Sequence, residues 1–117
     1  MINFQTFAHL ASIDLGEAEA KPTSINGDQY EASHTLWTSD DGLVEVGVWE
    51  CTSGRFTAAR ETNSEICHIV SGRVTLHNSD GSSKDVGSGE VLVLPIGWIG
   101  EWTLHETTRK LYLHFKG

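Results

Sequence analysis

The segment GRFTAARETNSEICHIVSG, residues 54–72, decides the fold that this chain is expected to adopt. It ends in an apolar run, Ile66–Val70, which is typical of a β-strand and is entered through the carboxylate of Glu65. Apolar segments with strand-like alternation lie on both sides of it. We therefore expect the remaining chain to complete a sheet structure around this run.

Further strand candidates follow one another along the chain, separated by turn signals that recur every 8–12 residues or so. They are Thr35–Trp37, Leu43–Cys51, Arg73–His77, Ser83–Val86, Val91–Leu94, Trp102–His105 and Leu111–Phe115. Val91–Leu94 is apolar at every position, which predicts a strand covered on both faces. The whole pattern predicts an all-β sandwich or barrel and disfavours alternating strands and helices.

The first 33 residues differ in character from the rest. Phe4, Phe7, Leu10 and Ile13 recur at threefold spacing, which fits either a short amphipathic helix or an arm that packs on the barrel or on a partner subunit. The segment from Pro22 to Ser33 is expected to be irregular, with a turn at residues 26–28. We thus expect an N-terminal arm over residues 1–33 and a single barrel domain over residues 34–117.

The composition excludes some classes of partner. The formal net charge is −8, and no cluster of Lys and Arg is present, so nucleic acids and anionic membranes are not expected partners. No apolar stretch is long enough for a membrane span, and no signal peptide is evident, which indicates a cytoplasmic protein. Cys51 and Cys67 each lie within a strand pattern, so we expect two buried, reduced thiols.

Two spaced motifs resemble those of the cupin superfamily, whose fold is a small jelly-roll β-barrel. In the first, six residues separate Glu65 from Gly72; in the second, five residues separate Gly89 from Pro95, and Gly97 follows after one more. The sequence is most similar to short cupins of the DUF861 type, related to (S)-ureidoglycine aminohydrolase and the ethanolamine-utilisation cupin. The stretches that carry this resemblance are residues 47–50, 63–72, 89–98, 101–102 and 109–112.

The resemblance also raises the question of a metal, because many cupins bind a divalent cation through three histidines and one glutamate. In the register that respects strand alternation, the histidine positions fall on Ala58, Arg60 and Gly100, and only Glu65 matches a ligand. His114 is the one other histidine expected to face inward. We therefore expect no cofactor, and a divalent metal remains the less favoured alternative.

Strand alternation predicts a polar set inside the barrel. Glu65 and Cys67 share the inward face, and Arg60 could supply the positive charge that a buried carboxylate needs. Lys110 and Tyr112 alternate along the last strand, so we predict Glu65, Lys110 and Tyr112 as candidate catalytic residues. The structural alternatives are a buried ion pair and a surface lysine.

The remaining candidates would contact a ligand together with Arg60 and Cys67. Trp102 is expected to form a pocket wall, Trp98 to rim the pocket mouth, and Glu50 to reach the pocket edge. Core packing explains the two tryptophans equally well, and a solvated strand end explains Glu50.

These expectations define a pocket for a small polar metabolite of carboxylate or amide type. The protein would act on it as a hydrolase or isomerase-like enzyme, or bind it without chemistry as a sensor. A third alternative is a structural module with a vestigial pocket. A β-sheet-mediated homodimer, expected from the apolar outward residues Ile66 and Val70, is compatible with all three.

Overall fold

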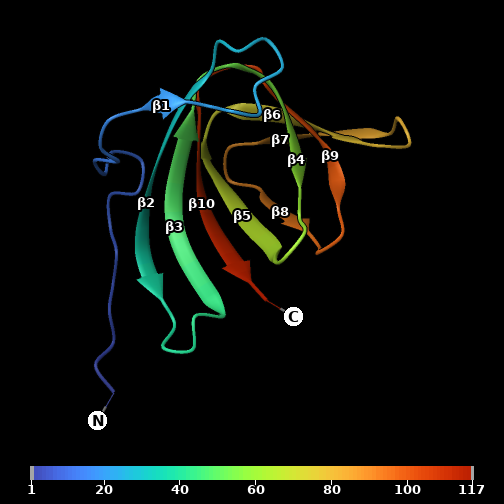
Figure 1. Ribbon diagram of the computed structural model, residues 1–117. Coiled ribbons are helices and arrows are strands. Elements are labelled where there is room, and N and C mark those ends of the chain that lie inside the picture. The colour runs from blue at the N-terminus through green and yellow to red at the C-terminus, as the bar shows by residue number, and fades with distance from the viewer. Residues whose placement is uncertain (1, 117) are drawn as a thin grey trace.

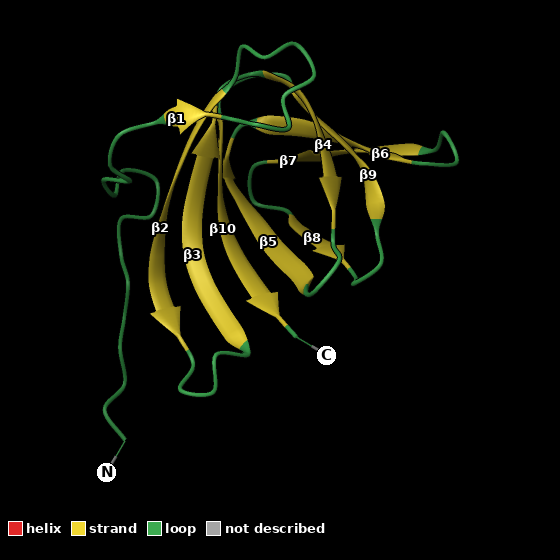
Figure 2. Ribbon diagram, in the orientation of Figure 1, coloured by secondary structure: helices red, strands yellow, loops and turns green. Residues whose placement is uncertain are grey.

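The structure is a computed structural model that describes residues 2–116, and it consists of two antiparallel β-sheets facing each other (Figures 1 and 2). The larger sheet has the strand order β1-β2-β3-β10-β5-β8, and the smaller has the order β4-β9-β6-β7. Residues 2–116 contain no helix, and hence none long and apolar enough to cross a membrane. The strands are β1 (Glu19–Ala20), β2 (Tyr30–Thr38), β3 (Val44–Cys51), β4 (Gly54–Ala59), β5 (Ser64–Ser71), β6 (Arg73–Asn78), β7 (Ser83–Gly87), β8 (Val91–Leu94), β9 (Ile99–Leu104) and β10 (Thr108–Phe115).

The chain passes repeatedly from one sheet to the other, which is the arrangement of a jelly roll and confirms the expected fold class. Residues 54–72 show why this segment is decisive: its first half is β4 in the smaller sheet, and its second half is β5 in the larger sheet. Its two apolar faces therefore meet across the interior. The core between the sheets is built from Trp49, Phe56, Ile69 and Trp102 together with smaller apolar side chains.

The strand β8 forms one edge of the larger sheet and differs from the expectation of cover on both faces. Leu94 is buried, whereas Val91 is 62% and Val93 is 55% exposed. The two valines pair with His68 and Ile66 of β5, so they lie on the outer face of the sheet. An all-apolar strand thus indicates that its inner face is buried but says nothing about what covers the other.

The N-terminal arm is extended and not helical. It has one turn, in which the carbonyl oxygen of His9 accepts hydrogen bonds from the amides of Ser12 and Ile13, and its first residues run alongside β2 (Figure 1). Arg109 Nη1 donates to the carbonyl oxygens of Leu10 and Ile13, at 2.9 Å each. Two carbonyl groups of the arm are therefore satisfied by a barrel side chain, which anchors this turn to the barrel.

Residues 21–29 lead from the arm into the barrel. Thr57 of β4 donates its amide to the carbonyl oxygen of Thr23, and the amide of Ile25 donates to the carbonyl oxygen of Arg55. This segment thus crosses the outer edge of β4. The strand β2 then begins at Tyr30, inside the region expected to be irregular, because Glu31 to Ser33 pair with the end of β3.

Candidate functional site

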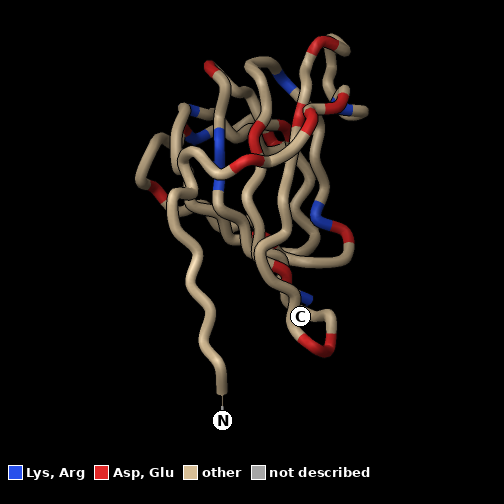
Figure 3. The backbone as a smooth tube through the Cα atoms, turned by 90° about the vertical axis from the view of Figure 1, so that its left-hand side faces the viewer, with Lys and Arg blue, Asp and Glu red and all other residues tan. Residues whose placement is uncertain are grey.

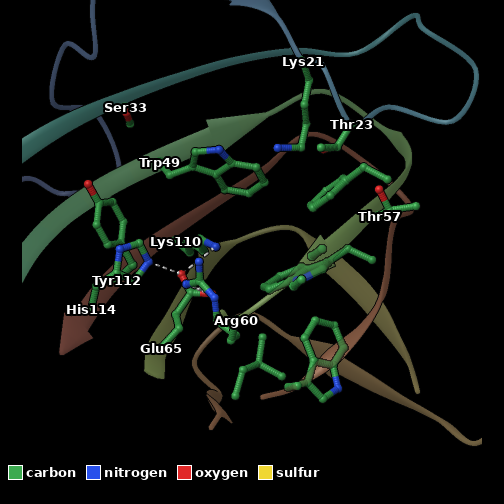
Figure 4. A pocket seen from close by; sticks show the side chains of 16 residues that line it. Lys21, Thr23, Ser33, Trp49, Thr57, Arg60, Glu65, Lys110, Tyr112 and His114 are labelled. Atoms are coloured by element: carbon green, nitrogen blue, oxygen red, sulfur yellow. Dashed lines mark hydrogen bonds and ion pairs between the residues drawn. The ribbon is translucent and has the colours of Figure 1, made fainter. Parts of the chain in front are cut away.

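A cavity of about 360 Å³ lies between the two sheets, in the interior of the barrel (Figure 4). Strands from both sheets and the segment before β2 contribute to its walls. Aromatic side chains form much of the wall; Arg60, Glu65, Lys110 and His114 gather toward one end, and Lys21 lies at the other (Figure 4). The lining residues are Lys21, Thr23, Ser33, Trp49, Phe56, Thr57, Ala58, Ala59, Arg60, Glu65, Leu94, Trp98, Trp102, Lys110, Tyr112 and His114.

Glu65 is the centre of the charged cluster, and only 4% of its surface is exposed. Its Oε2 atom lies 3.0 Å from Lys110 Nζ and 2.9 Å from His114 Nε2, and its Oε1 atom lies 3.8 Å from Arg60 Nη1 (Figure 4). Burial alone would raise the pKa of this carboxyl, but the charge of Lys110 and the hydrogen bond from His114 outweigh it and lower the pKa to about 2. Glu65 is therefore a carboxylate at any physiological pH.

Lys110 is held tightly, and its ammonium group has little freedom. The Nζ atom lies 4.5 Å from the ring centroids of both Trp49 and Trp102, in addition to its ion pair with Glu65. Two indole faces and one carboxylate together stabilise the buried cation. Lys110 thus acts as the fixed counter-charge of Glu65, and the two charges neutralise each other.

Arg60 is the cationic group that remains available. Its backbone is fixed by two hydrogen bonds, from its amide to the carbonyl oxygen of Trp98 and from the amide of Gly97 to its own carbonyl oxygen. The side chain is 23% exposed, and within residues 2–116 the guanidinium makes no hydrogen bond, only the 3.8 Å contact with Glu65. Its planar set of N–H donors is therefore free to bind an anion in the cavity.

His114 completes the cluster from β10. Because Glu65 is ionised and can only accept, His114 Nε2 carries the proton of the hydrogen bond between them. The Nδ1 atom of a neutral His114 is then an acceptor. The ring also lies against that of Tyr112, with 4.5 Å between the centroids, so its orientation is fixed from two sides.

Tyr112 lines the wall, but its hydroxyl is engaged elsewhere. It donates to Glu45 Oε2 at 3.1 Å, and burial together with the charge of Glu45 raises its pKa to about 12. The ring lies directly over Gly47 of the neighbouring strand, where a Cβ atom would be 2.3 Å from the hydroxyl oxygen. Tyr112 therefore shapes the cavity, and its position does not favour the catalytic role predicted for it.

The structure separates two predicted residues from the cavity. Cys67 faces inward but is buried in the hydrophobic core; burial raises its pKa to about 12, and it does not line the cavity. Glu50 accepts a hydrogen bond from Arg109 Nε at 3.0 Å and so belongs to the anchor of the N-terminal arm. Cys67 thus has the expected inward parity, whereas the expectation for Glu50 is wrong: Trp49 and Cys51 supply the inner face of β3, and Glu50, which alternates with them, lies on the opposite face.

Trp102 and Trp98 both line the cavity, as expected. Trp98 also explains the residue at position 100, where the resemblance implies a histidine. A Cβ atom on Gly100 would lie 2.4 Å from Trp98 Cζ2 and 2.2 Å from the carbonyl oxygen of His77. The indole thus occupies the space that a side chain at Gly100 would need.

These observations bear on the metal that the cupin fold implies. Of the four ligand positions, Ala58 and Arg60 line the cavity without a ligand atom, and Gly100 has no side chain. Within residues 2–116, no group of three or more His, Cys, Asp and Glu side chains is arranged to hold a metal ion. The oxygens of Glu65 face cations, so this donor set does not fit the metal site of the fold.

Four aromatic or ionisable lining residues were not among the predicted site residues. Trp49 and Phe56 form the aromatic wall beside Trp102, with Phe56 stacked on Trp102 at 5.8 Å. Lys21 enters from the segment before β2; its Nζ atom lies 2.9 Å from Glu31 Oε1 and 4.3 Å from the Phe56 centroid. His114 could be found from its parity with Lys110 and Tyr112, whereas Lys21 lies in a region without strand periodicity.

The charge of the cavity is opposite to that of the chain. Lys21, Arg60 and Lys110 line it together with one buried carboxylate, Glu65, although the chain as a whole carries −8. Elsewhere the acidic residues are spread over loops and strands, and basic positions are isolated (Figure 3). The cavity is thus a local cationic site with aromatic walls, suited to a small anion.

This combination of a jelly-roll barrel and an internal pocket defines a cupin. The EutQ-like cupin domain family matches residues 38–112, so the chain belongs to this family. A search of functionally curated proteins found no match.

Solved structures share the fold at low sequence identity. EutQ from Clostridium difficile superposes with a TM-score of 0.76 and 19% identity, over 92% of this chain and 84% of that one. A DUF861 protein from Pseudomonas syringae gives 0.73 and 23%, over 85% of this chain but only 42% of its own length. A putative ethanolamine utilization protein Q from Salmonella typhimurium gives 0.69 and 18%, over 85% and 78%.

Proposed function

We propose that this cupin binds a small carboxylate-bearing metabolite in the barrel cavity, with Arg60 as the group that anchors the carboxylate. The observation that carries the proposal is the unequal engagement of the cations around Glu65. Lys110 Nζ lies 3.0 Å from Glu65 Oε2 and is held between two indole rings. Arg60 Nη1 lies 3.8 Å from Glu65 Oε1, and its hydrogen-bond donors are free. A ligand carboxylate can satisfy these donors as a bidentate pair without displacing Glu65.

The rest of the cavity suits the body of such a ligand. Trp49, Phe56, Trp98 and Trp102 provide apolar surface, and Lys21, which is paired with Glu31, places an ammonium group at the end away from Glu65 (Figure 4). A volume of about 360 Å³ accommodates a metabolite-sized molecule. Binding would therefore combine one charged anchor with contacts to aromatic rings.

A thermal-shift panel of small carboxylates tests this proposal, with the corresponding primary amides as neutral counterparts. Carboxylates should stabilise the protein more than their amides, and Arg60→Gln should lower the affinity for them about tenfold or more. Arg55→Gln is the matched control, because Arg55 is exposed and pairs with Glu101 outside the cavity. Equal stabilisation by amides, or unchanged binding in Arg60→Gln, would refute the proposal.

Catalysis at the same site is the second candidate function, and the pair of Glu65 and His114 favours it. A carboxylate that fixes one nitrogen of an imidazole leaves the other to accept a proton, as a general base requires. The resemblance to ureidoglycine aminohydrolase suggests an amide or ureide substrate. NMR of a stabilising ligand after long incubation distinguishes the two: turnover abolished by His114→Asn indicates an enzyme, and an unaltered ligand indicates a binding protein.

A homodimer is the remaining part of the proposal. The outer face of the larger sheet carries Ile66, Val70, Val91 and Val93, and the two valines of β8 are more than half exposed. A second copy of the chain would remove this apolar surface from water. Light scattering at micromolar concentration should give the mass of a dimer, and Val91→Lys with Val93→Lys should give a monomer. A monomeric wild-type protein would contradict it.

A further inference from the structure

The cavity is lined by the free edge of β4 as well as by the inward-facing side chains of this strand. Four successive residues, Thr57, Ala58, Ala59 and Arg60, line it, although alternate side chains of a strand point to opposite faces. A second hollow, on the outer side of β4, shares Thr57, Ala58 and Ala59. The backbone at this edge is therefore part of the wall between the cavity and the second hollow.

The hydrogen-bond pattern shows which backbone groups point toward this free edge. Because β4 is the edge strand of its sheet, only alternate residues direct their amide and carbonyl groups toward β9. The amide of Thr57 and the carbonyl of Arg55 point away from β9 and bond to Thr23 and Ile25. The amide and the carbonyl of Arg60 point to the side of β9, where they bond to Trp98 and Gly97. By the same alternation, the amide and the carbonyl of Ala59 both point away from β9, toward the free edge of β4, and Ala59 lines the cavity.

Within residues 2–116, no protein group forms a hydrogen bond with the amide or the carbonyl of Ala59. The segment that contains Thr23 and Ile25 covers the edge of β4 only as far as Thr57, whose amide bonds to Thr23. Among the described residues, 2–116, this segment forms no hydrogen bond with Ala59. Edge strands are usually protected by charged side chains or by covering segments. Here the side chains are those of a threonine and two alanines, so nothing bulky or charged blocks the edge. The next residue is Arg60, the free cation of the cavity.

We infer that the cavity selects α-amido carboxylates, that is N-acylated amino acids, over other small carboxylates. In such a molecule the amide N–H and one carboxylate oxygen lie on the same side of the extended chain, like the N–H and C=O of a strand residue. The N–H would donate to the Ala59 carbonyl, the carboxylate oxygen would accept from the Ala59 amide, and the second oxygen would face Arg60. This inference rests on the proposed function, since the same carboxylate must reach Arg60.

Three nearly isosteric ligands test the selectivity directly: N-acetylglycine, O-acetylglycolate and 4-oxopentanoate. They share the acetyl group, the chain length and the carboxylate, and differ only in an NH, an oxygen or a methylene at one position. NMR titration of the protein labelled with nitrogen-15 should show N-acetylglycine binding about three- to tenfold more tightly than the other two, the value of one net hydrogen bond. Its titration should also shift the backbone amide signal of Ala59.

Variants at Ala59 test the backbone contact. Ala59→Pro removes the amide donor, and it should be tolerated because proline is accepted on an edge strand where the N–H does not face a partner strand. It should remove the preference for N-acetylglycine, whereas Ala59→Ser, which keeps the amide, should retain it. The Ala59 signal of the wild-type protein gives an independent reading if Ala59→Pro does not fold.

The outcomes separate this inference from the proposed function. If all three ligands bind equally, lose affinity in Arg60→Gln and leave the Ala59 signal unmoved, the inference is wrong while the carboxylate site stands. If none of the three binds at millimolar concentration, both are overturned. Preference for N-acetylglycine that persists in folded Ala59→Pro would also exclude the edge of β4 as its cause.

Discussion

His114 Nε2 lies 2.9 Å from Glu65 Oε2, although 49 residues separate them in the chain. The antiparallel pairing of β10 with β5 places the two residues directly opposite each other. Lys110 reaches the same carboxylate oxygen from four residues earlier on β10. One strand thus supplies two of the three basic side chains within 4 Å of Glu65, and these two lower its pKa.

Replacement of Glu65 by Gln should destabilise the protein by about 3 kcal/mol, because it leaves the Lys110 ammonium buried without a counter-charge. Urea unfolding measures this effect as a lower midpoint with an unchanged slope. Glu101→Gln is the control: it removes the same charge from an exposed pair with Arg55 and should cost well under 1 kcal/mol. Equal effects of the two substitutions would argue against a strongly stabilised Glu65.

The lowered pKa of Glu65 also predicts how stability depends on pH. The pKa is about 2 in the folded protein and near 4.5 in the unfolded chain, so the unfolded state binds the proton first as the pH falls. The stabilisation is complete above pH 4.5 and is lost as the pH falls through 2, and it amounts to roughly 3 kcal/mol. Acid unfolding of the wild type and of Glu65→Gln tests this, because the variant should lose less stability over this interval.

Gly47→Ala should destabilise the protein by about 1–3 kcal/mol, because the new methyl group would overlap the buried ring of Tyr112. Gly87→Ala is the matched control. Gly87 is also in a strand and has no positive φ. A Cβ atom added there would lie 3.9 Å from its nearest neighbour, Glu90 Oε1. Thermal unfolding of both variants compares them; a Gly47→Ala protein as stable as Gly87→Ala would contradict the packing described here.

Arg109→Met should release the N-terminal arm, because Arg109 donates hydrogen bonds to Leu10 and Ile13. Thermolysin cleavage between residues 9 and 13, located by mass spectrometry, should become several-fold faster. Arg73→Met serves as the control, since Arg73 is exposed and makes no side-chain hydrogen bond within residues 2–116. Cleavage at an unchanged rate would show that the arm is held by other contacts.

Much of the fold was predictable because local rules act on each strand. Alternation placed Glu65, Lys110, Tyr112 and His114 on the inner face, and the register of β5 and β10 confirms that parity. The same rule placed Cys67 inward correctly, yet could not distinguish the core from the cavity. Parity assigns a face of a sheet, and the position along the strand decides whether that face meets packed side chains or open space.

The balance of charges within the site was not predictable in the same way. The sequence suggested Arg60 as the partner of Glu65, whereas Lys110 and His114 lie closer and leave Arg60 free. Lys21 gave no signal, because its segment is neither helix nor strand and enters the cavity only by crossing the edge of β4. Such contacts join residues far apart in the chain, and no local pattern encodes their distances.

The sequence by itself determined the all-β class, the cupin resemblance and the loss of the histidine ligands at Ala58, Arg60 and Gly100, since spacing and residue type suffice for each. Only the tertiary structure decided which cation neutralises Glu65, that Trp98 fills the space above Gly100, and that Ala59 on the free edge of β4 lines the cavity. The physical reason is that alternation and turn chemistry act over a few residues, whereas ion pairs and packing depend on distances set when the two sheets come together.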